Sequence, residues 1–125
     1  MRVSLALLAV AVVVCSGCRA PGGGSDPLDA VADRYVRLVL AVGRHDPAYV
    51  DAYYGPPEWK EEAARGEPRP VRDLLREAGD LRARAESAPA SDRREFLVKQ
   101  LVAVEAFVRR LGGERMSVER EARDL

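Results

Sequence analysis

Cysteine, histidine and net charge are scarce in this sequence, and each scarcity argues against a class of function. The chain of 125 residues has two cysteines, one histidine, and 20 basic against 20 acidic residues, so its formal net charge is zero. Zero net charge gives no electrostatic reason to bind nucleic acid. A zinc site needs several converging His, Cys, Asp or Glu side chains. We therefore predict no nucleic-acid partner and no metal or other cofactor held by these residues.

Catalytic groups are equally sparse. His45 has no serine or cysteine partner nearby in the sequence, and Ser91 and Ser117 are explained as helix caps or loop residues. The acidic residues include no pair that the sequence selects for glycoside chemistry. We predict no catalytic residue in this chain, and whether it serves an enzyme depends on a longer parent protein.

The longest apolar run, Val3–Val14, follows Arg2 and precedes small residues. A bilayer-spanning helix needs about 20 apolar residues, and this run is well short of that. A basic residue, a short apolar run and a small-residue cleavage site are typical of a secretory signal.

Ser16 and Gly17 stand before Cys18, and small residues before a cysteine resemble the lipobox of bacterial lipoproteins. In that pattern the cysteine is acylated and becomes the new N-terminus, although Cys15 occupies a position that is usually aliphatic. Acyl chains stabilise membrane binding by about 0.8 kcal/mol per buried CH₂. We predict a lipoprotein-type signal peptide over residues 1–17, lipidation at Cys18, and anchoring on the extracytoplasmic side of the envelope. Secretion or a periplasmic location is the alternative.

Residues 18–25 are rich in glycine and form a predicted flexible tether to a helical domain at 26–125. Apolar residues at spacings of three and four predict long helices at 27–42, 70–88 and 93–111, the last with Asp92 as its cap. Their apolar stripes are Leu28, Val31, Tyr35, Leu38 and Val42; Val71, Leu74, Ala78, Leu81 and Ala85; and Leu97, Leu101, Val104, Val108 and Leu111. No segment alternates with period two. The sequence therefore predicts an all-α fold, a small antiparallel bundle or array.

The segment His45–Trp59, called the aromatic stretch below, contains the only histidine, the only tryptophan and most of the tyrosines. We predict a short helix from Asp46 to Gly55 and a second one from Pro57 to Gly66. Two interpretations of its aromatic side chains are open, a ligand-binding face for peptide or sugar and a packing face between helices, and an aromatic stripe at helical spacing favours packing. The candidate residues are Tyr49, Tyr53, Tyr54 and Trp59.

Ser117 and the acidic residues after it are typical of a helix start, and no glycine or proline ends that helix before Leu125. So short a helix is marginal without packing partners. We expect the helical domain to continue in a larger polypeptide, with a frayed tail as the alternative.

Two segments also support a family resemblance. YVRLVLAVGRHDPAYVDAYYGPPEW (35–59) and FLVKQLVAVEAFVRRLGGERMSVEREARDL (96–125) resemble the N-terminal region of bacterial exported proteins related to a family of zinc-dependent peptidases. The resemblance implies a long helical chain whose His-Glu-x-x-His motif and zinc lie far downstream. None of that motif lies here.

Two functions follow as hypotheses. The first is a lipid-anchored, non-catalytic helical segment of a larger metallopeptidase-like protein, whose partners are the membrane and later helices of the parent or a protein partner. The second is a complete small lipoprotein that acts as a binding or interaction module through the aromatic stretch.

Overall fold

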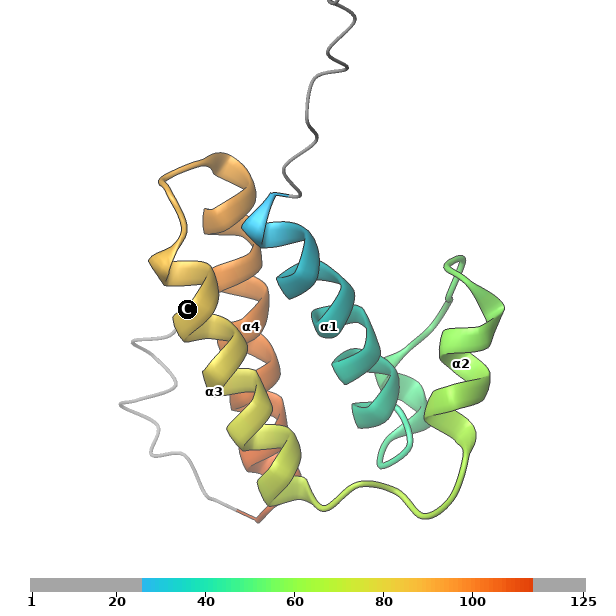
Figure 1. The fold of residues 1–125 in the computed structure, drawn as a ribbon. Coiled ribbons are helices and arrows are strands. Elements are labelled where there is room, and N and C mark those ends of the chain that lie inside the picture. Colours follow the sequence, from blue (N-terminus) through green and yellow to red (C-terminus); the bar gives the residue numbers. More distant parts are fainter. Residues whose placement is uncertain (1–25, 114–125) are drawn as a thin grey trace, which may run out of the picture.

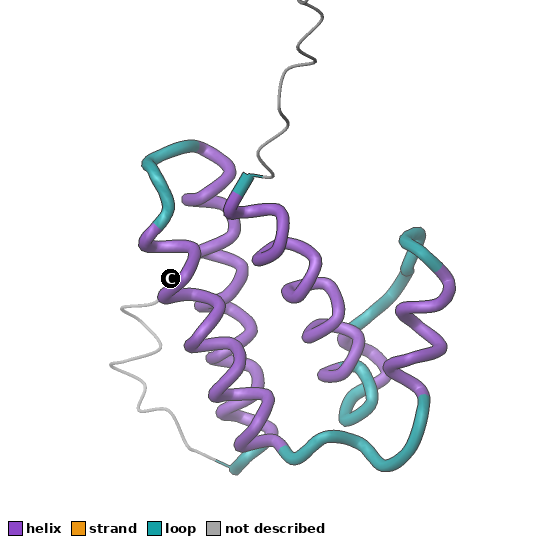
Figure 2. Tube along the Cα trace, in the orientation of Figure 1, coloured by secondary structure: helices purple, strands orange, loops and turns teal. Residues whose placement is uncertain are grey.

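The computed structural model describes residues 26–113, which form four α-helices and one 3₁₀ turn. In chain order these are α1 (Pro27–Val42), η1 (Pro47–Tyr49), α2 (Pro57–Ala64), α3 (Val71–Ser87) and α4 (Asp92–Leu111). Figure 2 shows helices and loops and no strand in this part of the chain. The predicted all-α bundle is confirmed.

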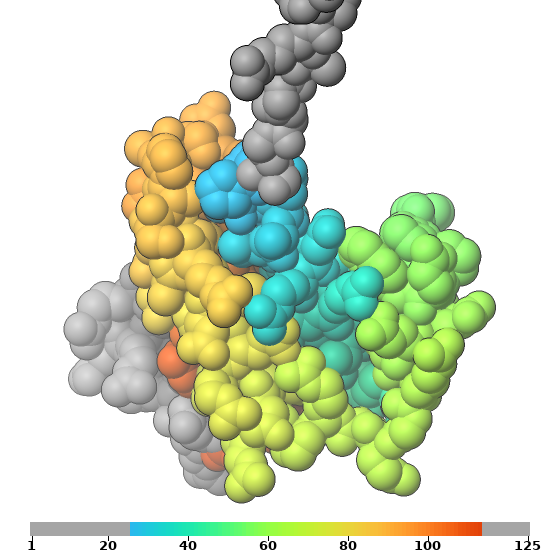
Figure 3. Space-filling model, in the orientation of Figure 1, coloured from blue at the N-terminus to red at the C-terminus, as the bar shows by residue number. Residues whose placement is uncertain are grey.

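The long helices α1, α3 and α4 form the bundle. Helices α3 and α4 are an antiparallel hairpin with the most extensive packing, and α1 lies against both of them. Helix α2 packs against α1 and stands beside the bundle (Figure 1), where it forms a separate lobe on the molecular surface (Figure 3). None of the residues of α2 is buried. The molecule is therefore a three-helix core with a lightly attached side helix.

The core consists mainly of the stripes that the sequence predicts, together with Ala41 and Ala88, which lie outside them. Most residues of each stripe are buried; Tyr35, in the middle of the first stripe, and Val71 and Leu111, at the ends of the other two, are half-buried. The largest fully buried side chains are Leu38, Val42, Leu74, Leu81, Leu101, Val104 and Val108. Burying one such side chain stabilises the fold by about 1.5–3 kcal/mol.

Local signals set the helix ends. Asp26 caps α1, because its Oδ1 accepts from the Leu28 amide at 2.9 Å and Pro27 occupies the first helical position. At α4 the cap is Ser91, whose Oγ accepts from the Arg94 amide at 3.1 Å. The prediction of Asp92 as cap is wrong by one residue, and Asp92 instead begins the helix.

The predicted helix from Asp46 to Gly55 is also wrong. Only Pro47–Tyr49 form a single 3₁₀ turn, and Val50 is already extended, with φ −121° and ψ 92°. Proline disfavours helical backbone in the residue before it, which restricts Gly55 and then Pro56. Too few residues remain between for a helix to nucleate.

Cys18, the tether and Ser117 lie outside residues 26–113, so the signal peptide, lipidation and continuing helix stay predictions. Among the helices within that range, none is long and apolar enough to cross a bilayer.

Candidate functional site: an arginine-lined pocket

The structure disperses the four aromatic candidates. Tyr49 stacks on Phe107 of α4, with ring centroids 4.1 Å apart and an interplanar angle of 28°, and is half-buried. Tyr54 points into solvent and is 96% exposed. Tyr49 therefore packs against the core, whereas the Tyr54 side chain is almost fully exposed to solvent.

Tyr53 belongs to the turn before α2. Its hydroxyl donates to the Pro56 carbonyl at 2.9 Å, and its ring covers Gly55. A Cβ at Gly55 would lie 2.5–2.8 Å from ring and hydroxyl atoms of Tyr53, so glycine is required for this approach. Tyr53 thus shapes the entry to α2, whereas Tyr49 packs on α4.

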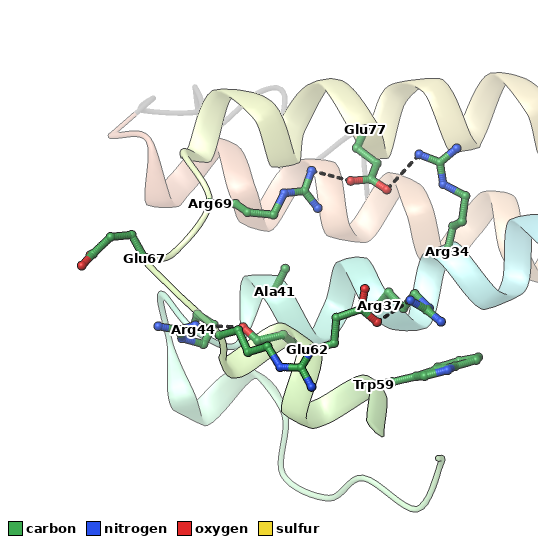
Figure 4. A pocket seen from close by; sticks show the side chains of 11 residues that line it. Arg34, Arg37, Ala41, Arg44, Trp59, Glu62, Glu67, Arg69 and Glu77 are labelled. Carbon is green, nitrogen blue, oxygen red and sulfur yellow. Dashed lines mark hydrogen bonds and ion pairs between the residues drawn. The ribbon is translucent and has the colours of Figure 1, made fainter. Parts of the chain in front are cut away.

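Trp59 lines a hollow in the surface of the part of the chain that the structure describes. The guanidinium of Arg37 lies over its ring, 4.7 Å from the centroid, a cation–π contact between α1 and α2. The hollow has a volume of about 310 Å³ and lies between α1, α2, the 65–70 segment and α3 (Figure 4). We call it the arginine pocket, and its lining residues are Arg34, Arg37, Ala41, Arg44, Trp59, Glu62, Ala63, Arg65, Glu67, Arg69 and Glu77.

One wall of the arginine pocket is built around Glu77. Its carboxylate accepts from Arg34 Nη2 at 3.2 Å through Oε1 and from Arg69 Nη2 at 2.6 Å through Oε2. The Glu77 side chain is 16% exposed, whereas the two arginines are about half exposed. Glu77 therefore joins α1 and the 65–70 segment to α3 (Figure 4).

The opposite wall is held by Arg37 of α1 and by Arg44 in the turn that follows α1. Arg37 pairs with Glu62 of α2 through Nη1. Arg44 donates to the carbonyls of Ala63 at 2.8 Å and Gly66 at 3.1 Å, which ties the end of α2 and the residues after it to the turn that follows α1. These contacts position a helix that buries no side chain of its own.

The lining carries five arginines and three glutamates, so positive charge is in excess. Within residues 26–113, Arg65 makes no ion pair and lines the pocket from the end of α2. An excess of guanidinium groups in a small hollow favours an anionic ligand.

His45 is close to this pocket but has a structural contact. Its Nε2 lies 2.7 Å from the Arg69 carbonyl, which connects the turn after α1 to the segment before α3. In the part of the chain that the structure describes, no group of three His, Cys, Asp or Glu side chains could hold a metal ion.

The comparisons with known proteins give no relative: no protein-family model, no curated protein and no solved structure matches the chain.

None of the pocket residues other than Trp59 was among the candidates predicted from the sequence. A signal was present in α1 and the turn after it, where Arg34, Arg37, Ala41 and Arg44 recur at spacings of three and four on a second stripe. The loop arginine, Arg69, joins them only through the fold.

Proposed function

We propose that this chain is a lipid-anchored, extracytoplasmic helical domain of a larger metallopeptidase-like protein, non-catalytic by itself. The anchor part of the proposal is supported by the apolar run and by Ser16-Gly17-Cys18. With the folded body beginning at Asp26, residues 18–25 are a short tether that keeps the body close to the membrane surface.

The observation that carries the larger-protein part is the distribution of apolar residues around α4. Besides its buried stripe, α4 has Phe96 at 58% and Val102 at 44% exposure, with exposed Ala103 and half-buried Ala106 and Phe107 beside them. Large apolar side chains exposed outside a stripe that is already buried favour a further packing partner on this helix. Later helices of a parent chain would cover this side of α4.

The size of the native protein tests this proposal. An antibody raised against the helical body, used on envelope fractions of the source bacterium, should detect a protein well above 13.7 kDa. A single band at or below that mass would contradict the larger-protein proposal. That band would instead support the alternative of a small lipoprotein that binds a partner.

The anchor is tested separately by a Cys18→Ser variant. Wild-type protein should sediment with membranes, and the variant should not, because an acylated cysteine supplies the membrane affinity. Continued sedimentation of the variant after a high-salt wash would contradict lipid anchoring at Cys18.

A further inference from the structure

We propose that the arginine pocket binds the carboxylate end of a short peptide. This function goes beyond membrane anchoring and does not depend on it. It rests on three properties of the pocket: unused guanidinium donors, carboxylates placed beside them, and an apolar floor.

Donors for a carboxylate remain after the internal contacts are counted. Arg34 and Arg69 each reach Glu77 through a single nitrogen, and a guanidinium has five N–H groups. Arg65 contributes a further cation that no carboxylate neutralises within residues 26–113. Arginine holds planar carboxylates through paired hydrogen bonds, so a peptide terminus matches this side of the pocket.

The acidic lining favours a peptide over a purely anionic ligand. Glu62 is 57% exposed and Glu67 is also exposed, so both can accept hydrogen bonds from N–H groups. A phosphate group has negative oxygens throughout and would be repelled by these carboxylates. A peptide presents its carboxylate to the arginines and its amide or ammonium groups to the glutamates.

The size and apolar part of the pocket limit the ligand to a few residues. Its volume of about 310 Å³ is at the small end of the range for small-molecule sites, roughly 300–1,000 Å³. Ala41, Ala63 and the Trp59 ring provide the apolar surface on which a side chain can lie. Because α2 buries none of its residues, the wall that it forms can adjust at little cost in packing.

The test uses Trp59 as its reporter, since it is the only tryptophan of the chain. The protein, expressed from the full sequence and purified in a non-ionic detergent, is titrated with trialanine and with trialanine amide, which lacks the terminal carboxylate. Trialanine should change Trp59 fluorescence saturably and the amide should not. Isothermal titration calorimetry repeats both titrations, so that a fluorescence-silent binding event is still detected.

Two variants that each remove one positive charge test whether trialanine binds in the arginine pocket. Arg65→Ala removes a pocket cation, and Arg72→Ala removes a cation at 85% exposure that does not line the pocket. Loss of one charge-assisted contact corresponds to about tenfold weaker binding. Arg65→Ala should weaken trialanine binding by that factor, and Arg72→Ala should leave it within twofold of wild type.

Four results would overturn the proposal. They are the absence of saturable binding of trialanine by both methods, equal binding of acid and amide, equal loss in the two variants, and displacement of trialanine by inorganic phosphate at matched ionic strength. None of them bears on membrane sedimentation or on the size of the native protein, so a failure here is distinct from failure of the proposed anchoring function.

Discussion

Arg82 on α3 donates through Nε to Glu105 Oε1 on α4 at a distance of 2.6 Å. The Glu105 side chain is 7% exposed, and its other oxygen accepts from Arg109 Nη2 at 3.3 Å, one turn further along α4. The hydrogen bond to Glu105 is the largest cause of the raised pKa of Arg82. Buried charge is tolerated here because both carboxylate oxygens have a cationic partner, and the Arg82–Glu105 pair links α3 to α4.

Glu105→Gln should therefore destabilise the protein. The substitution keeps the volume but replaces charge-assisted hydrogen bonds with neutral ones, which are about half as strong. Because both arginines are more than a third exposed and can be hydrated, we expect a loss of about 1–2 kcal/mol in the free energy of unfolding, measured by urea denaturation. Glu86→Gln, which alters the exposed partner of Arg82, should cost less than about 0.5 kcal/mol. Equal losses of unfolding free energy in the two variants would contradict the conclusion that the buried carboxylate of Glu105 contributes more than the exposed one of Glu86.

The stacked pair of Tyr49 and Phe107 should contribute to stability, whereas Tyr54 should not. Tyr49→Ala removes a half-buried ring and its aromatic contact, and we expect a loss of about 1–3 kcal/mol. Tyr54→Ala removes a ring at 96% exposure and should change stability by less than about 0.5 kcal/mol. Thermal unfolding followed by circular dichroism compares the two variants. A Tyr54 variant as unstable as the Tyr49 variant would show that the aromatic stretch packs differently.

Ser91→Ala should weaken the start of α4. Its hydroxyl satisfies the Arg94 amide, and loss of such a cap costs about 1 kcal/mol. Ser87→Ala is the matched control. Ser87 is the last residue of α3, and its hydroxyl donates to the Arg84 carbonyl and, within residues 26–113, accepts from no backbone amide. The denaturation midpoint of Ser91→Ala should fall below that of Ser87→Ala. The reverse order would assign the cap elsewhere, for instance to Asp92.

Stability should fall in alkaline solution through two tyrosines. Burial raises the pKa of Tyr35 above its usual 10.0. The pKa of Tyr49 is also raised, mainly by burial and to a smaller extent by the charge that Tyr35 would carry nearby. The native state thus retains protons that the unfolded chain releases, so the stabilisation is complete below pH 10 and is lost as pH rises through the folded-state values. The double variant Tyr35→Phe/Tyr49→Phe should show a smaller fall in the unfolding free energy between pH 9 and 11. If the unfolding free energy of the double variant fell as steeply with pH as that of the wild type, the two tyrosines would not be the cause of the alkaline loss of stability.

The helices were predictable because their signals are local. The stripes of α1, α3 and α4 repeat at the helical period, and proline, glycine and capping residues mark their ends, so fold class and core follow directly. The 46–55 helix failed because proline's effect on the preceding residues outweighs helical spacing over so few positions.

The arginine pocket was not predictable from spacing alone. Glu77 pairs with Arg34, which lies 43 residues earlier in the sequence. The packing of α3 on α1 brings the two side chains together. The burial of Glu105 was likewise not predictable from the sequence, where it resembles the other charged residues of α4. Its burial arises from the close approach of α3 and α4. Such long-range pairs depend on tertiary packing, which local patterns do not encode.

The mass of the mature N-terminal peptide, determined by tandem mass spectrometry on protein from a bacterial envelope, tests the central claim most directly. We predict that the first residue is Cys18 and that it carries a diacylglyceryl group. A mature N-terminus at any other residue, or Cys18 with a free thiol, would contradict a lipid-anchored domain.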